Sequence, residues 1–258
     1  MRKLLSKIYI VLILVFLYAP IGVLIAFSFN ASKSRSVWEG FTFKWYVNLF
    51  QDAQVLKALS NTFVIAVLSM LFATILGTAA ALGMHCMKSR SRKMLTMITN
   101  IPMLSPEIVT GVSLMLLFVF IFKSTGFLAP GLWTLVLAHT TFCLPYVIFS
   151  VLPKFRQINP NLYEAALDLG CTPVKAFFKV ILPQISSGIV TGAMLSFTLS
   201  IDDFVITYFT SGTLQTLPTI IYSMTRKMVS PEINALSAIL FLLVLLLSFE
   251  KERRQRKI

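Results

Sequence analysis

Long apolar runs separated by short polar segments make up most of this chain. A helix needs about 20 residues to cross the hydrocarbon core of a bilayer, and six runs approach or exceed that length. They lie at Ile8–Phe29, Asn61–Leu82, Ile98–Phe122, Leu132–Leu152, Ile185–Phe209 and Ile233–Phe249. Pro102 and Pro106 interrupt the third run, so its helix is expected to begin near Ser105. The pattern predicts an all-α integral membrane protein with six transmembrane helices.

Composition and charge agree with this prediction. The chain is 57% hydrophobic and 13% charged, whereas a soluble domain is about half apolar and a quarter charged. Most of its 23 Lys and Arg fall in segments that would lie on one side if the N-terminus were inside: 1–7, 88–93, 154–179 and 251–257. Cytoplasmic loops carry such an excess, so both termini are expected in the cytoplasm. The net charge of +13 then needs no nucleic-acid partner.

The chain is expected to form a single transmembrane domain, 1–258, without a soluble module. The longest outer loop, Lys33–Leu59, is expected to contain a short interfacial helix near Phe43–Phe50. The cysteines and histidines lack the spacing of a metal site or a disulfide framework: Cys86, Cys143, Cys171, His85 and His139. They are interpreted as free thiols and packing residues.

Small residues recur every four positions in the second and fifth runs. They are Ala73, Gly77 and Ala81 in the second run, and Gly188, Gly192, Ser196 and Ser200 in the fifth. Such stripes let helix backbones approach closely inside a membrane. They predict tight helix packing, either within the chain or with a partner.

Two adjacent acids, Asp202 and Asp203, lie in the fifth run, in the stretch SFTLSIDDFVITYFTSG. A charge in hydrocarbon is costly unless it is paired or hydrated. On a regular helix Asp203 falls in the middle of the small-residue stripe and Asp202 about 100° away, both in the outer third of the membrane. The two acids are therefore expected either to face a hydrated cavity or to pair with Arg226 or Lys227.

A third acid, Glu107, follows Ser105 and Pro106. This order is typical of a helix start, with Ser105 as N-cap, Pro106 at the first helical position and Glu107 near the positive end of the helix dipole. Glu107 is therefore either part of a helix start or a charge in the wall of a pathway.

A long polar insertion, Lys154–Gln184, separates the fourth and fifth runs. Asn159 and Pro160 predict a first short helix that ends at Gly170 in a left-handed cap. Thr172 and Pro173 predict the start of a second helix, which Pro183 is expected to close. Two helices at a fixed bend indicate a docking element in the cytoplasm, and the alternative is an amphipathic helix lying on the membrane.

Within the insertion, Glu164, Ala165, Ala166, Gly170 and Pro183 lie in the pattern E-A-A-x3-G-x9-V-x-L-P, with Val180 at the tenth position after Gly170. This pattern resembles the EAA signature, E-A-A-x3-G-x9-I-x-L-P, of the permease subunits of ABC importers, in which Val180 replaces the usual Ile. The resemblance implies a type I ABC importer permease fold, in which these five residues couple the chain to a cytoplasmic ATPase. The chain has no G-x-x-x-x-G-K-[ST] phosphate loop, so we expect no cofactor on it, with ATP and Mg²⁺ bound by the partner.

The resemblance extends to the PotC-type permeases of spermidine/putrescine importers, through GFTFKWY, LSPEIV, HTTFCLPYV, LSFTLSIDDFVITYFTSG and IYSMTRKMVSPEINAL. It implies passage of polyamines across a bacterial inner membrane, with Trp45, Glu107, Ser200, Asp202 and Asp203 at positions associated with that passage. Trp45 has an alternative role as an interfacial anchor. The implied partners are a second related permease, an ABC ATPase homodimer and an extracytoplasmic polyamine-binding protein.

Three alternatives remain at this point. The first is an ABC importer for another small solute, although an anion would favour basic residues inside the spans, where the sequence has none. The second is an ion-coupled carrier with Glu107 and Asp203 as relay groups, which leaves the insertion unexplained. The third is a membrane enzyme, for which no catalytic constellation is visible.

Overall fold

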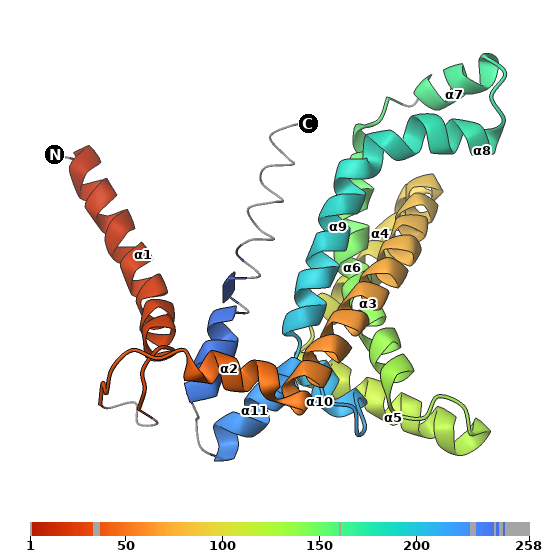
Figure 1. Cartoon of the computed structure of the whole chain (residues 1–258). Coiled ribbons are helices and arrows are strands. Elements are labelled where there is room, and N and C mark those ends of the chain that lie inside the picture. Colours follow the sequence, from red (N-terminus) through yellow and green to blue (C-terminus); the bar gives the residue numbers. More distant parts are fainter. Residues whose placement is uncertain are drawn as a thin grey trace. The chain divides into compact units, whose positions relative to one another are not determined.

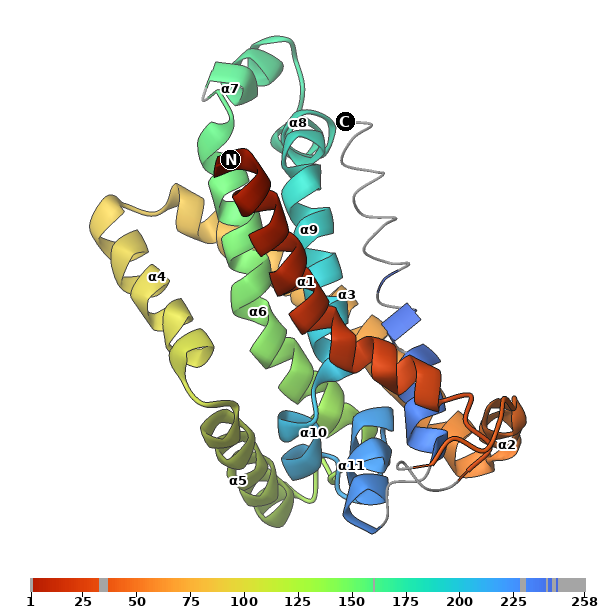
Figure 2. The same cartoon turned by 90° about the vertical axis from the view of Figure 1, so that its left-hand side faces the viewer.

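A computed structural model describes residues 2–32, 37–159, 161–227, 231–239, 241–242 and 245. This part of the chain is helical, as predicted, apart from loops and one isolated bridge between Asn30 and Phe41. Figures 1 and 2 show its elements: α1 (Arg2–Phe27), α2 (Lys44–Gln51), α3 (Ala53–Cys86), α4 (Ser89–Leu104), α5 (Glu107–Thr125), α6 (Leu132–Gln157), α7 (Asn161–Asp168), α8 (Pro173–Ala176), the π-helical turn η1 (Phe177–Ile181), α9 (Leu182–Asp202), α10 (Val205–Thr210) and α11 (Leu217–Lys227).

Five described helical stretches are long and apolar enough to cross a membrane. They are Ser6–Phe27, Ala53–Cys86, Glu107–Thr125, Leu132–Gln157 and Pro173–Asp202. The predicted sixth span, Ile233–Phe249, lies largely outside the described residues, although 231–239 are helical. The chain forms two compact units, one of 1–58 with 220–258 and the other Leu59–Thr219.

Helix α6 is the centre of the Leu59–Thr219 unit, and α9 packs along it. Gly188, Gly192, Ser196 and Ser200 on α9 are all buried. A Cβ added to Gly188 would lie 2.7 Å from the carbonyl oxygen of Ser150 on α6. The predicted stripe therefore serves packing within the chain. The stripe on α3 does the same, because a Cβ on Gly77 would lie 2.7 Å from the Cβ of Val147.

Alanine in place of Gly188 is expected to destabilise the protein, while the same change at Gly83 is expected to stabilise it. Both glycines lie inside helices, where Ala is favoured by about 1 kcal/mol. The added methyl group meets α6 backbone at Gly188 but nothing within 4 Å at Gly83. The midpoint of heat-induced unfolding of the purified transporter should therefore move in opposite directions. A higher midpoint for Gly188→Ala would contradict the close approach of α6 and α9.

The third run contains two helices instead of one. Helix α4 extends from Ser89 to Leu104, with Pro102 inside it, and α5 begins at Glu107. Ser105 is the C-cap of α4 in an extended conformation, as expected before a proline, and its Oγ donates to the Ile101 carbonyl at 2.8 Å. The predictions of Ser105 as N-cap and of Pro106 at the first helical position are therefore wrong, because Pro106 is itself the N-cap of α5, while the prediction of Glu107 in the first turn is confirmed.

The fifth run is also interrupted. Helix α9 ends at Asp202, Asp203 is extended (φ −67°, ψ 115°), and α10 begins at Val205. The assumption of a regular helix through both acids is wrong. Beyond the break, α10 packs on α5, where a Cβ on Gly111 would lie 3.0 Å from the Phe209 ring.

The other unit contains the outer-loop helix predicted near Phe43–Phe50, which is observed as α2. Phe29, Phe41, Phe43 and Tyr46 form an aromatic cluster in which the Phe29 and Phe41 rings stack 5.0 Å apart. The cluster joins the loop after α1 to α2. Lys33 and Arg35 of this loop lie outside the described residues.

Candidate coupling segment and pathway residues

The insertion predicted between the fourth and fifth runs folds as two short helices beyond the ends of α6 and α9 (Figure 1). Asn159 caps the first of them, α7, because its Oδ1 accepts the Asn161 amide at 3.1 Å and its carbonyl accepts the Leu162 amide. The predicted cap at Asn159 is confirmed. Pro160 lies outside the described residues.

Gly170 ends α7 with a positive φ of 84°. The Cys171 amide donates to the Ala166 carbonyl, and the Gly170 amide donates to the Leu167 carbonyl. This pair of bonds defines a Schellman cap, which favours glycine because its left-handed residue has no Cβ. The predicted left-handed cap is confirmed, and it reverses the chain between α7 and α8.

Thr172 is the N-cap of α8, as predicted, because its Oγ1 accepts the Lys175 amide at 3.4 Å and its carbonyl accepts the Ala176 amide at 2.9 Å. The prediction that Pro183 closes this helix is wrong. Helix α8 continues through η1 directly into α9, and Pro183, which has no amide hydrogen, lies just after this π-helical turn, where the regular hydrogen-bond pattern of the helix is already shifted. The second half of the insertion is therefore continuous with a membrane span.

The signature residues divide between the surface and the interior of this segment. Glu164 and Ala165 are exposed on α7, while Ala166 is 7% exposed and faces inward. Because η1 joins α8 to α9 without a break, a force on the segment would be transmitted to a span.

Gly170→Ala is expected to impair uptake, while Gly126→Ala is expected to leave uptake unchanged. Both glycines have positive φ, 84° and 70°, and a Cβ on either would meet nothing within 4 Å. Each substitution therefore adds similar backbone strain of about 1 kcal/mol. Only Gly170 sets the bend between α7 and α8. Substrate uptake at matched protein levels tests this, and equal loss in both variants would contradict a role for the bend.

A buried polar network connects α6 with the break between α9 and α10. The His139 ring of α6 is 2% exposed and shares hydrogen bonds with Ser200 Oγ at 2.7 Å and Thr207 Oγ1 at 2.9 Å. Asp203 Oδ2 lies 3.5 Å from His139 Nε2 and accepts the Thr207 amide at 2.9 Å. The Ile206 amide donates to Asp203 Oδ1 at 3.4 Å.

The two adjacent acids therefore differ in their surroundings. The Asp203 carboxylate is buried and satisfies amide groups at the start of α10. Asp202, in the last turn of α9, is exposed, and so is Glu107 in the first turn of α5. Of these three acids, Asp202 and Glu107 are exposed to solvent, whereas Asp203 is engaged with neighbouring groups, as is Ser200 through its hydrogen bond to His139.

Trp45 belongs to the other unit, where it is 3% exposed. Its Nε1 donates to the Asn30 carbonyl at 2.7 Å, which fixes α2 to the loop after α1. Lys44 Nζ lies 5.9 Å from the centre of the Trp45 ring. In this structure the Trp45 indole holds the loop in place.

His139 was expected to be an ordinary packing residue, and its place in this polar network was not predicted. One sequence feature could have predicted this network. A histidine lies inside one span, and a neighbouring span carries hydroxyl residues with acids beside them. The described residues contain no group of three or more His, Cys, Asp and Glu able to hold a metal ion.

The chain has membrane-crossing helices and, between the fourth and fifth predicted spans, a capped pair of short helices. This arrangement defines a class of protein, the permease subunits of binding-protein-dependent ABC importers. The chain belongs to the family described as binding-protein-dependent transport system inner membrane component, which matches residues 73–250. It is therefore a multi-pass inner-membrane subunit that has no ATPase activity and binds no cofactor itself. It works in a complex with an ATPase and a periplasmic binding protein.

Three relatives illustrate the similarity. The putrescine transport system permease protein PotI of Escherichia coli (strain K12) is 40% identical over 228 residues, 87% of this chain and 81% of that protein. The spermidine/putrescine transport system permease protein PotC of the same organism is 38% identical over 233 residues, 90% and 86% of the two chains. PotC of Haemophilus influenzae is 36% identical over 247 residues, 95% and 94%.

Solved structures share the fold at low sequence identity. A chain of a bacterial ABC transporter that imports the acidic polysaccharide alginate superposes with a TM-score of 0.78 at 13% identity, covering 98% of this chain and 95% of that chain. A chain of the MetNI methionine ABC transporter superposes with a TM-score of 0.63 at 19% identity, covering 78% and 94%. These likenesses show the permease fold alone.

Proposed function

We propose that this chain is a permease subunit that carries polyamines, spermidine or putrescine, into the cell by alternating access. The observation that carries the proposal is the identity of 36% to 40% with three polyamine permeases over at least 81% of their lengths. The mechanism needs an extracytoplasmic polyamine-binding protein to deliver the substrate and an ABC ATPase homodimer to drive the conformational change.

The exposed acids support a cationic substrate. Asp202 ends α9 and Glu107 begins α5, both within the Leu59–Thr219 unit. The Tyr208 ring, 54% exposed, lies one turn into α10 and 5.5 Å from the Phe204 ring. Carboxylates attract the amino groups of a polyamine, and aromatic faces contribute about 0.5–2 kcal/mol each by cation–π contact. Asp202 is proposed as the primary acid of the pathway, with Asp203 holding the break that presents it.

The coupling segment supports an ATP-driven mechanism. In the proposed orientation both termini and α7–η1 lie in the cytoplasm, and α7 fits a cleft of the ATPase through Glu164, Ala165 and Ala166. Gly170 sets the bend, and Pro183 begins the span that moves. A second, related permease supplies the other half of the pathway, since one six-span subunit lines only one side.

Import of another solute is the second candidate, because chains of alginate and methionine transporters share this fold. Fold therefore does not select the substrate. The ion-coupled carrier remains a weaker alternative, since it gives the capped segment α7–η1 no role. The purified chain would then transport under an ion gradient in proteoliposomes without an ATPase.

Uptake of labelled spermidine, putrescine and a sugar in a strain lacking only this chain tests the proposal. Loss of uptake of one or both polyamines with normal sugar uptake, restored by the intact gene, is the expected result. Normal uptake of both polyamines would overturn the choice of substrate. Polyamine uptake by the purified chain without an ATPase would overturn the mechanism.

A further inference from the structure

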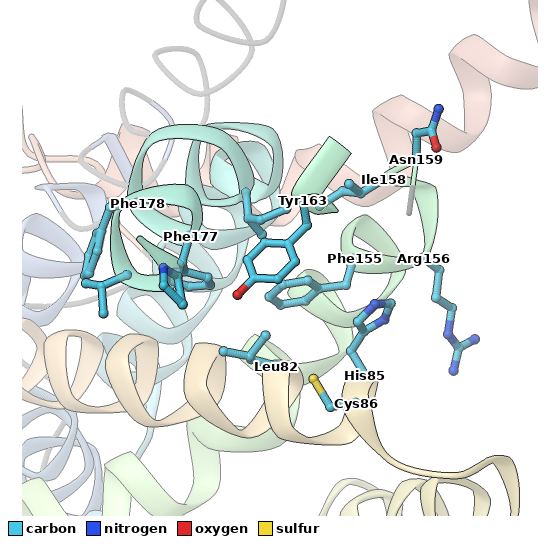
Figure 3. A pocket seen from close by; sticks show the side chains of 13 residues that line it. Leu82, His85, Cys86, Phe155, Arg156, Ile158, Asn159, Tyr163, Phe177 and Phe178 are labelled. Carbon is cyan, nitrogen blue, oxygen red and sulfur yellow. The ribbon is translucent and has the colours of Figure 1, made fainter. Parts of the chain in front are cut away.

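A cavity of about 900 Å³ lies behind the coupling segment. Figure 3 shows the cavity, with Leu82 and Cys86 from the end of α3, Phe155 from α6, Tyr163 from α7 and Phe177 from η1. The cavity thus contacts the last turns of two spans and the segment that is proposed to move them. Its walls are mostly apolar, so an apolar group would gain by entering it.

The rim of the cavity is basic. Arg156 lines it, and the exposed His85 ring stacks on Phe155 at 5.4 Å between ring centres. Three further exposed lysines lie within two residues of lining residues in the sequence, Lys88 after α3, Lys175 in α8 and Lys179 in η1. The acids of the same segment are Glu164, which follows the lining residue Tyr163, and Asp168, both exposed on α7, and like the three lysines neither lines the cavity. Arg156 and the three lysines outnumber these two acids. The local charge therefore complements an anion.

The cavity also lies at the depth of lipid headgroups in the proposed orientation. Leu82, His85 and Cys86 form the last turn of α3, and Arg156 and Ile158 lie where α6 ends. Basic residues at the cytoplasmic ends of spans are attracted to anionic lipid, and basic pockets between spans on that side bind anionic headgroups. A ligand with acyl chains and a negative headgroup satisfies both the apolar walls and the basic rim.

We propose that this cavity binds an anionic phospholipid of the inner leaflet, with an acyl chain between α3 and η1 and the phosphate near Arg156. Bound there, the lipid joins the ends of α3 and α6 to the coupling segment and stiffens the connection through which the ATPase acts. The proposal rests on the orientation given under the proposed function, and it is independent of the transported solute.

The proposal is tested by measuring how much phosphatidylglycerol the purified complete transporter retains, with native mass spectrometry as the readout. Leu82→Trp fills the cavity, and Arg156→Gln removes the rim charge without adding bulk. Leu71→Trp is the matched control, since Leu71 is 48% exposed on the outer face of the same helix. Arg156→Gln is expected to retain about fivefold less phosphatidylglycerol than the control, the effect of losing one basic contact with anionic lipid. Leu82→Trp is expected to retain less than the control as well, because the indole occupies the space of the acyl chain.

A second measurement uses the native thiol of Cys86, which is exposed and lines the cavity. Alkylation of Cys86 is expected to be slower in nanodiscs containing phosphatidylglycerol than in nanodiscs of phosphatidylcholine alone, with Cys171 as the internal control. Equal lipid retention in all variants together with equal alkylation rates would overturn the proposal. Cross-linking of Cys86 to the ATPase would also overturn it, because a protein segment would then occupy the cavity. Since neither readout measures uptake, failure here is distinguishable from failure of the polyamine proposal.

Discussion

Glu164→Arg is expected to lower polyamine uptake at least about tenfold while the protein remains folded and inserted, because reversing a charge at a docking contact costs more than 1.4 kcal/mol. Glu164 is exposed on α7. The substitution therefore removes no contact on which the chain's own packing depends. It instead places a positive charge against the basic partner that the coupling role requires.

Glu39→Arg provides the matched control for this prediction. It makes the same charge reversal at an exposed side chain in the loop between α1 and α2, which is not part of the coupling segment. Uptake, amount of inserted protein and co-purification of the ATPase should be measured for both variants. The coupling role predicts loss of uptake and of co-purified ATPase in Glu164→Arg alone. Normal uptake by Glu164→Arg, or equal loss in both variants, would contradict that role.

The coupling segment was readable from the sequence because its signals are local. Asn159, Gly170 and Thr172 each act through hydrogen bonds to atoms within five residues along the chain. Their effect therefore depends little on the rest of the fold. Pro183 was misread for a related reason. A proline beyond the first turn usually disrupts a regular helix, but the sequence did not reveal the π-helical turn η1 just before Pro183, through which α8 continues into α9.

The break between α9 and α10 was not readable from the sequence, because no Pro or Gly marks it. It depends on contacts between distant parts of the chain, as His139 is separated from Ser200 by 61 positions and from Thr207 by 68. The helical wheel correctly assigned Ser196 and Ser200 to the packed stripe. It failed beyond Asp202, where its assumption of constant rotation no longer holds.

Asp202→Asn and Asp203→Ala are expected to impair the transporter in different ways. Asp202 is exposed, so the amide should leave the unfolding midpoint unchanged and reduce uptake about fivefold, the effect of one carboxylate–ammonium attraction of about 1 kcal/mol in a hydrated site. Asp203→Ala removes the acceptor of the Thr207 and Ile206 amides, and it should lower the free energy of unfolding by about 1–3 kcal/mol.

Asp203→Asn separates charge from hydrogen bonding at the same position. An asparagine oxygen can still accept the Thr207 amide and is as good as aspartate at the start of a helix, so this variant should retain most of the stability and uptake that Asp203→Ala loses. Kinetics of spermidine and putrescine uptake at matched protein levels, with unfolding midpoints, distinguish the roles. If Asp203→Asn lowered uptake as much as Asp202→Asn without loss of stability, the buried carboxylate would have to meet the substrate. The contacts that bury Asp203 at the break between α9 and α10 would then have to separate during transport, because Asp203 is only 8% exposed in this structure.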